Sequence, residues 1–234
     1  QVTDCIIEDC VVDGFGTATY YSTLGITIES GTDTVSNSRN LIRNCLVRDA
    51  TVAANARGII MESNYSRVVG CSVQNIASVP DSDDVVGISL NKCTGSQITG
   101  CSVDNIYGYA YSVQNGRIAG GDTTFVNQSN SVTGNSANVC RFGVEASGGS
   151  NLTISSNSFR GTVPIVGGGA AEGIEVNADS TAALSVLSNT VIHGNCLDAF
   201  EGNAIWVGRG SAGSGTLISV SVSGNSISST DKAG

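Results

Sequence analysis

The sequence predicts an all-β solenoid, in which short strands stack in parallel from one coil to the next. Two observations lead to this prediction: a composition suited to strands and turns, and two short phrases that recur in a fixed order. The chain has 234 residues, of which 30 are glycine and only 2 are proline. Together with many Ser, Thr, Asn and Val residues, this composition favours short strands and tight turns over long helices.

The first phrase is a short strand that runs into a Cys or Asn, as in "RNCLV" and "TGNSA". Successive anchors lie 22 to 36 residues apart. The anchors are Cys10, Cys45, Cys71, Cys101, Asn135, Asn157, Asn189 and Asn225. Asn at a turn can hydrogen-bond both its own backbone and its stacked neighbours, and Cys is a small residue that buries easily. The repeat therefore predicts a ladder of Asn and Cys along one edge of the solenoid.

The second phrase follows each of the first seven anchors and has the form Gly-Ile-x-Val. It reads "GITI" at 25–28, "GIIM" at 58–61, "GISL" at 87–90, "AYSV" at 110–113, "GVEA" at 143–146, "GIEV" at 173–176 and "AIWV" at 204–207. Alternation places the Ile and Val side chains inside and the residue between them outside. Stacked coils of this kind predict three long parallel sheets around an apolar interior.

Both phrases resemble the right-handed parallel β-helix family, the pectate-lyase-like superfamily, from about Val2 to Ile227. The resemblance implies a single right-handed parallel β-helix of about eight coils that occupies residues 1–234. Because the chain begins at Gln1 in the middle of a predicted strand, we expect it to be a segment of a longer chain. The fold alone does not fix an activity, since it supports many chemistries.

Composition narrows the class of partner. The net charge is −9, with 20 acidic and 11 basic residues, which disfavours nucleic acid as a partner. No apolar run reaches the ~20 residues of a membrane span, so membrane insertion is not expected. We also expect no cofactor and no metal site, because the cysteines lack zinc spacing and the acidic "PDSDD" at 80–84 lacks a calcium pattern. A neutral partner fits this chain best.

The eight cysteines are predicted to be free thiols, most of them buried. Stacked anchors would lie about 5 Å apart, but parallel stacked side chains rarely present the torsion of a disulfide. Reduced ladder cysteines suit folding in a reducing compartment. Cys5, Cys93, Cys140 and Cys196 lie off the ladder and receive no role.

The outward residues of the second phrase predict where chemistry could occur. In chain order they are Thr27, Ile60, Ser89, Ser112, Glu145, Glu175 and Trp206. Glu145 and Glu175 fall on adjacent coils, about 5 Å apart. Like charges this close raise at least one pKa, so one carboxyl group can serve as a general acid while the other stays ionised. Rotamers span the separations of both retaining and inverting glycosidases, so the mechanism stays open.

Trp206 follows in the same column, and its exposed indole would suit the flat apolar face of a sugar ring. Asp198 and Glu201 are reserve candidates for catalysis. Further candidates for substrate binding are Arg141, Arg209, Glu172 and Tyr111. Two alternatives remain open: a solvated face formed by the two glutamates, and packing of Trp206 under a loop or against another subunit.

Within the superfamily, the chain lacks three catalytic patterns: the aspartate cluster with a basic residue of pectate lyases, the Gly-His-Gly of polygalacturonases and the Asp-Pro-His of alginate epimerases. It most resembles bacteriophage tailspikes and capsular depolymerases, in which carboxylates on such strands cleave polysaccharide. The resemblance implies a glycoside hydrolase that acts on a polysaccharide or oligosaccharide, forms a homotrimer and works outside the cell or on the virion surface. A non-catalytic glycan-binding adhesin or structural spike, and a polysaccharide lyase, are the alternatives.

Overall fold

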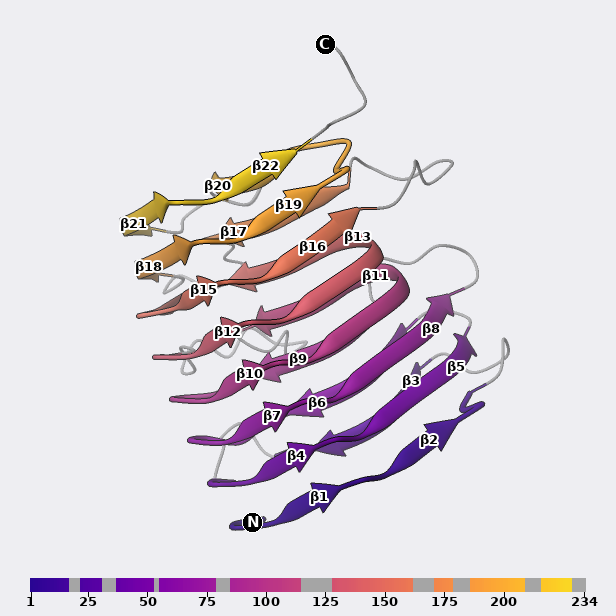
Figure 1. Ribbon diagram of the computed structural model, residues 1–234. Helices are drawn as coiled ribbons and strands as arrows, with labels where there is room; N and C mark the ends of the chain where they lie inside the picture. The colour runs from indigo at the N-terminus through magenta and orange to yellow at the C-terminus, as the bar shows by residue number, and fades with distance from the viewer. Residues whose placement is uncertain are drawn as a thin grey trace.

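The computed structural model describes residues 1–16, 22–30, 37–52, 55–78, 85–114, 128–161, 171–178, 186–208 and 216–228. The regular structure of these residues consists of β-strands, which rise in steps from β1 at one end of the molecule to β22 at the other (Figure 1). Every ladder between the strands is parallel, and partners come from successive repeats. The predicted parallel β-helix is therefore confirmed.

The strands form three faces, and each repeat contributes a strand to a face in turn. The first face contains β1 (Ile6–Glu8), β4 (Leu41–Arg43), β7 (Arg67–Val69), β10 (Gln97–Thr99), β12 (Ser131–Thr133), β15 (Thr153–Ser155), β18 (Val186–His193) and β21 (Thr216–Ser223), with β14 (Gly149–Ser150) beside β18. The second contains β2 (Val11–Asp13), β5 (Leu46–Val52), β8 (Ser72–Ser78), the first parts of β11 (Ser102–Gln114) and β13 (Ser136–Ser147), β16 (Ser158–Gly161), β19 (Cys196–Asp198) and β22 (Ser226–Ser228). The third contains β3 (Ser22–Ile28), β6 (Asn55–Met61), β9 (Val85–Asn91), the second parts of β11 and β13, β17 (Glu172–Asn177) and β20 (Ile205–Gly208).

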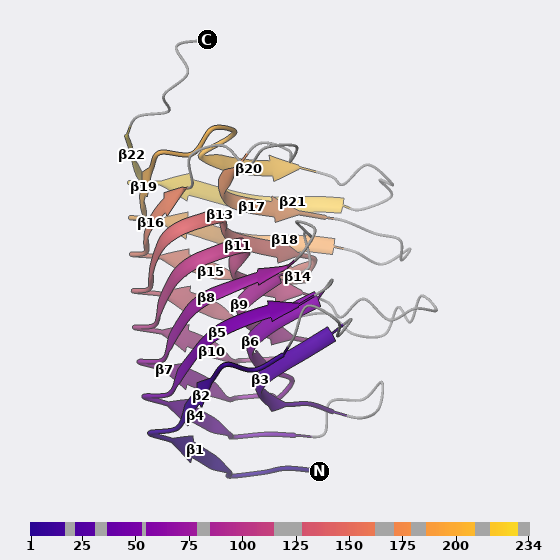
Figure 2. The same ribbon diagram turned by 90° about the vertical axis from the view of Figure 1, so that its right-hand side faces the viewer.

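The second and third faces are joined into one hydrogen-bonded sheet of 13 strands, whereas the sequence predicted three separate sheets. The difference arises because β11 and β13 run without a break around the corner between the two faces, as Figure 2 shows. Beyond this corner, a glycine stands near the start of the third-face part of β13. A side chain at Gly143 would meet the backbone oxygen of Gly173 and the ring of Phe159, so no larger residue fits there without a shift.

The interior is apolar and is filled by alternate residues of all three faces. One row runs up the first face through Ile42, Val68, Ile98, Val132, Ile154 and Ile192. A facing row on the third face contains Ile59, Ile88, Tyr111, Val144 and Ile174. Because each inward residue alternates with an outward one, the register that buries these rows also determines which residues form the outer columns.

The predicted ladder is present at the corner between the first and second faces, with one correction. The backbone N–H of Asn157 donates to Oδ1 of Asn195 (3.0 Å), and that of Asn195 donates to Oδ1 of Asn225 (2.9 Å). The ladder residue between Asn157 and Asn225 is therefore Asn195, and the prediction of Asn189 was wrong. Asn189 is in the left-handed conformation within β18, and its side chain donates to Oδ1 of Asn151.

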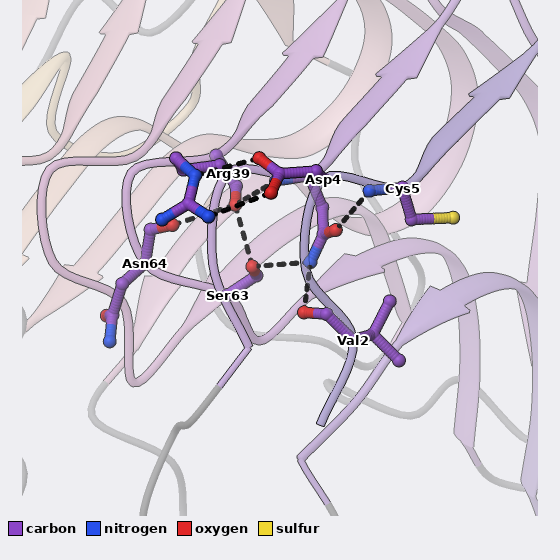
Figure 3. Close-up of polar contacts among 8 residues, drawn as sticks. Val2, Asp4, Cys5, Arg39, Ser63 and Asn64 are labelled. Carbon is purple, nitrogen blue, oxygen red and sulfur yellow. Dashed lines mark hydrogen bonds and ion pairs between the residues drawn. The ribbon is translucent and has the colours of Figure 1, made fainter.

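A second polar corner connects the third face to the first. The guanidinium of Arg39 makes two hydrogen bonds with the carboxylate of Asp4 (2.7 and 2.8 Å), and Figure 3 shows the two side chains facing each other. This bond to Arg39 lowers the pKa of Asp4. The backbone N–H of Arg39 donates to the carbonyl of Asn64 (2.9 Å). These contacts bind neighbouring coils together.

All eight cysteines are free thiols, as predicted. Cys45, Cys71 and Cys101 are buried at the ladder corner, while Cys10 at the first step of the ladder and Cys196 at the start of β19 are exposed. Cys93 and Cys140 are fully covered, and burial raises the pKa of each thiol to about 12. No helix in the described ranges combines the length and the apolar character that a membrane crossing needs.

Candidate functional site

The outer column predicted from the sequence is present in the hydrogen-bonded register of the third face. Thr27 pairs with Ile60, Ile60 with Ser89, Ser89 with Ser112, Ser112 with Glu145, Glu145 with Glu175, and Glu175 with Trp206. Strands paired in this way lie about 4.8 Å apart. One outer wall therefore carries three consecutive residues of the column: Glu145 on β13, Glu175 on β17 and Trp206 on β20.

Each glutamate is held by a side-chain amide from the next outer column. The Nε2 amide of Gln114, at the end of β11, donates to Oε2 of Glu145. The Nδ2 amide of Asn177, two residues beyond Glu175 on β17, donates to Oε1 of Glu175 (2.9 Å). Because residues two apart on a strand face the same side, the two amides and the two carboxylates form one polar patch.

The two glutamates differ in exposure. Glu145 is only 5% exposed, whereas Glu175 is partly open to solvent. The interpretation of both as members of a solvated face does not fit Glu145. The site thus offers one enclosed and one accessible carboxyl group on neighbouring strands.

The indole of Trp206 lies along its own strand, over Gly208. A Cβ atom added at Gly208 would overlap Cζ2 of the indole, so the six-membered ring occupies the space that a side chain would fill. Gly208 pairs with Asn177, which places the ring beside the amide that holds Glu175. Trp206 as a whole is partly exposed.

An aromatic pair borders the patch on its other side. The rings of Tyr109 and Phe142 are stacked with their centroids 4.6 Å apart, and Cζ of Arg141 lies 5.0 Å from the centroid of Phe142. Tyr109 and Phe142 are paired in register, three residues before Ser112 and Glu145 on their strands. Arg141 is buried beside them, so its guanidinium supports this aromatic pair from close by.

Tyr111 does not belong to this wall, contrary to the prediction that it binds substrate. Its ring is completely buried in the interior and lies 5.7 Å from the ring of Phe159, centroid to centroid. Its hydroxyl lies within hydrogen-bond distance of the carbonyls of Ser136 (2.7 Å) and Cys101 (3.0 Å), and burial raises its pKa. Tyr111 occupies the inward position that Ile or Val holds in neighbouring coils, which explains its burial.

The reserve acids do not join the two glutamates. Asp198 is on β19 of the second face, where it accepts a hydrogen bond from Ser228 (2.9 Å) and lies 3.8 Å from Arg160. Glu201 lies between β19 and β20, beyond the column. Glu172 begins β17 in register with Phe142 and accepts a hydrogen bond from Asn203 (3.1 Å). Arg209 and the acidic stretch 80–84 lie outside the described residues.

The sequence predictions missed Gln114, Asn177 and Phe142. A signal for the two amides existed, since Gln114 and Asn177 each follow the central residue of the second phrase by two positions and must share its face. Phe142 gave no such signal. It lies just after the point where the pairing register between β11 and β13 shifts by one residue, so the alternation is interrupted there.

No group of three or more His, Cys, Asp or Glu side chains suited to a metal ion occurs among the described residues. The side chains of the column can themselves transfer protons through the two carboxyl groups, donate hydrogen bonds from the two amides and stack a flat group on the indole.

A scan against models of protein families found no match for this chain, and a search of curated proteins found none either. Among solved structures, the chain is similar to an alginate lyase from Paenibacillus sp. str. FPU-7, with 13% identity and a TM-score of 0.45, over 96% of this chain and 95% of that one. It is also similar to the GH136 lacto-N-biosidase from Eubacterium ramulus (9% identity, TM-score 0.34, 93% and 55% of the two chains). A third similar structure is that of PfbA, a surface protein and adhesin of Streptococcus pneumoniae. Its sequence is 12% identical, the TM-score is 0.25, and the match covers 80% of this chain and 68% of that one. At TM-scores below 0.5, none of these likenesses assigns a function to the column.

Proposed function

We propose that this protein binds a polysaccharide along its third face and hydrolyses it at Glu145 and Glu175. The observation that carries the proposal is the register that makes Glu145, Glu175 and Trp206 consecutive members of one outer column. Most glycosidases cleave with a pair of carboxyl groups, and an aromatic ring beside such a pair can stack on a sugar. The amides of Gln114 and Asn177 add donors that orient the carboxylates.

The exposure of the two carboxyl groups suggests their roles. Glu145, which is enclosed, is the general acid and donates its proton to the glycosidic oxygen as the bond to the anomeric carbon breaks. Glu175, which water can reach, either removes a proton from the attacking water or attacks the anomeric carbon itself before water releases the sugar. In both cases water adds across the glycosidic bond. Trp206 stacks on a sugar ring and holds it in place.

Charge favours hydrolysis over the lyase alternative. A lyase removes a proton next to the carboxylate of a uronic acid, and that carboxylate must be neutralised during the reaction. Here the column presents two carboxyl groups, and the whole chain carries a charge of −9. A uronate placed against this wall would meet like charge, whereas a neutral sugar would not.

The proposal includes a biological setting, which is supported by the sequence resemblance to tailspikes and capsular depolymerases. In this setting the β-helix belongs to a homotrimeric spike outside the cell or on the virion surface, and it depolymerises a microbial surface polysaccharide. A trimeric mass in sedimentation equilibrium would support this setting, and a monomer at all concentrations would contradict the homotrimer.

The activity is tested with the purified protein and a panel of neutral and uronate-containing polysaccharides. Hydrolysis of at least one neutral glycan, measured as new reducing ends without an ultraviolet-absorbing unsaturated product, is the expected result. Unsaturated products would identify a lyase. Binding without any new reducing ends would instead favour the adhesin.

A further inference from the structure

The thiol part of the ladder ends at an accessible cysteine. Cys10, Cys45, Cys71 and Cys101 occupy the ladder corner in four successive coils, because the backbone N–H that follows each later cysteine donates to the carbonyl of the cysteine before it. Cys45, Cys71 and Cys101 are buried, whereas Cys10 is exposed. The row of thiols therefore opens to solvent at Cys10.

The side chains of Cys10 and Cys45 point in the same direction. Sγ of Cys10 donates to the carbonyl of Glu8 (3.2 Å), and Sγ of Cys45 donates to the carbonyl of Arg43 (3.2 Å). Glu8 and Arg43 are themselves paired in register. Side chains with the same orientation on paired strands keep the strand spacing of about 4.8 Å between their sulfur atoms. Burial raises the pKa of the Cys45 thiol, and the backbone and thiol of Cys10 also act on it, as expected of direct neighbours.

Packing explains the buried thiols but not Cys10. In later coils Asn holds this corner, and the Nδ2 amide of Asn135 donates to the carbonyl of Ile98 (3.1 Å). In an earlier coil Cys71 holds the equivalent position, with its Sγ 3.7 Å from the carbonyl of Ile42. A buried thiol thus replaces the amide as a small donor. Cys10 is exposed, so it does not fill space in the interior.

Two thiolates at the strand spacing match the ligands of a linear, two-coordinate metal ion. Thiolate is a soft ligand and selects soft ions such as Cu(I). A metal–thiolate bond is about 2.3 Å long, so a linear unit of sulfur, metal and sulfur spans about 4.6 Å, close to the strand spacing. The ion lies between the two sulfur atoms and needs no separate cavity, and the exposed Cys10 gives it an approach from solvent.

We propose that Cys10 and Cys45 bind one soft monovalent metal ion, Cu(I) or an ion of the same class, in linear coordination between neighbouring coils. Each sulfur forms one bond to the ion, both thiol protons pass to solvent, and the oxidation state of the metal does not change. The site needs two ligands, so it does not require the larger ligand groups that are absent from the described residues. It lies at the corner between the first and second faces and is independent of the proposed function.

The first experiment titrates the fully reduced protein with Cu(I), without oxygen and against an excess of a colorimetric Cu(I) chelator. The parent chain should retain one ion. Cys10→Ser should bind at least about a hundredfold more weakly, because loss of a ligand exceeds the roughly 10–100-fold effect of altering only its surroundings. Equal affinities of the parent and Cys10→Ser, or no retained ion in the parent, would overturn the inference.

Cys196→Ser is the matched control for this titration. Cys196 is also exposed, but it pairs in register with Ser158 and Ser226 and therefore has no thiol neighbour. This variant should bind Cu(I) like the parent. A loss of binding in Cys196→Ser equal to that in Cys10→Ser would show that any exposed thiol takes the ion, and would overturn the inference.

The second experiment locates the ion. Cys45→Ser keeps a small hydrogen-bond donor at the corner and should also lose the ion, with an unchanged circular dichroism spectrum. If this variant fails to fold, the exposed Cys10→Ser decides the question alone. X-ray absorption at the copper edge should show two sulfur neighbours, and sedimentation should show the same mass with and without Cu(I). Three or more sulfur neighbours, or a mass that doubles with Cu(I), would place the ion in a cluster or between chains and would overturn the inference.

Discussion

Gly208 determines where the indole of Trp206 lies, because the ring fills the space above that glycine. Gly208→Ala should push the ring away from the wall while the strand stays paired. We expect KM for the cleaved glycan to rise several-fold, with a loss of less than ~1 kcal/mol in stability, since the ring can swing into solvent. Trp206 is the only tryptophan of the chain, so its fluorescence reports the movement directly. An unchanged emission spectrum together with a changed KM would contradict this explanation.

Glu62 shows how burial ties stability to pH. It follows β6 on the third face, is half-buried, and accepts a hydrogen bond from the backbone N–H of Ser30 (3.0 Å). Burial raises the pKa of this carboxyl group, with Glu29 adding to the effect. A raised folded-state pKa gives stability that is complete below the ordinary carboxyl pKa and is lost as pH rises through the raised value.

The neutral isostere tests this directly. Glu62→Gln should match the parent protein in melting temperature near pH 4 and exceed it near pH 7, because only the parent acquires a partly buried charge. Thermal unfolding followed by circular dichroism at both pH values measures the difference. A variant that is less stable at pH 7 than at pH 4, relative to the parent, would show that the charged form is favoured in the fold.

Thiol reactivity should follow the exposure of the cysteines. Cys10 and Cys196 are exposed, whereas burial raises the pKa of Cys93 and Cys140 to about 12. Because both thiols are buried and largely protonated at pH 8, they should react with a thiol reagent only on unfolding. Replacing Cys10 and Cys196, together with the partly exposed Cys5, with serine should remove the fast phase of the reaction. A fast phase that persists would place a buried thiol in contact with solvent.

At the scale of elements, the corner between the first and second faces follows a rule that is visible in the sequence. The residue before each ladder position has a positive φ: Asp9, Asn44, Gly70, Gly100, Gly134, Ser156, Gly194 and Gly224. Left-handed conformation favours Gly, Asn and Asp. The pair Gly194–Asn195 therefore matches Gly134–Asn135 and Gly224–Asn225, and this match identifies Asn195 over Asn189.

The ladder predicts that substituting Asn195 lowers the stability of the protein more than substituting Asn189 does. Asn195 is buried, donates to the carbonyl of Ile154 and to Asn225, and accepts bonds from Asn157. Asn195→Ala should cost about 2–4 kcal/mol, because buried partners lose their hydrogen bonds. Asn189→Gly, which keeps the left-handed backbone, should cost well under half as much. Denaturant titration gives both values, and equal losses would contradict the assignment of Asn195 to the ladder.

For the whole molecule, the sequence was sufficient to predict the stacking but not how the outer wall is covered. Glycine, Ile and Val at fixed positions determined the register, and with it the adjacency of Glu145, Glu175 and Trp206. The same phrase also placed Tyr111 at an inward position, so its burial was predictable. The burial of Glu145, Ser112 and Ser89 was not, because alternation places all three on the outer side of their strands, where exposure is the ordinary expectation.

The sequence also did not predict where the reserve acids, Asp198 and Glu201, lie in the fold. Asp198 follows Glu175 by only 23 positions, yet the intervening corner turns it onto another face, beside Arg160. Two residues of a solenoid lie side by side when they occupy the same position in adjacent repeats. Because the loops differ in length from repeat to repeat, that position cannot be counted directly along the sequence. Asp198 consequently serves as a matched control for the two glutamates, since it is an acid on a neighbouring coil that faces elsewhere.

The most direct test compares the rate of reducing-end release by the parent protein with that of Glu145→Gln, Glu175→Gln and Asp198→Asn, on a neutral glycan that the parent cleaves. Both glutamine variants should lose about a hundredfold or more in rate while keeping the fold, because each loses a group that transfers a proton or attacks carbon. Asp198→Asn should retain the parent rate. A glutamine variant that cleaves at full speed would contradict the paired-carboxyl site.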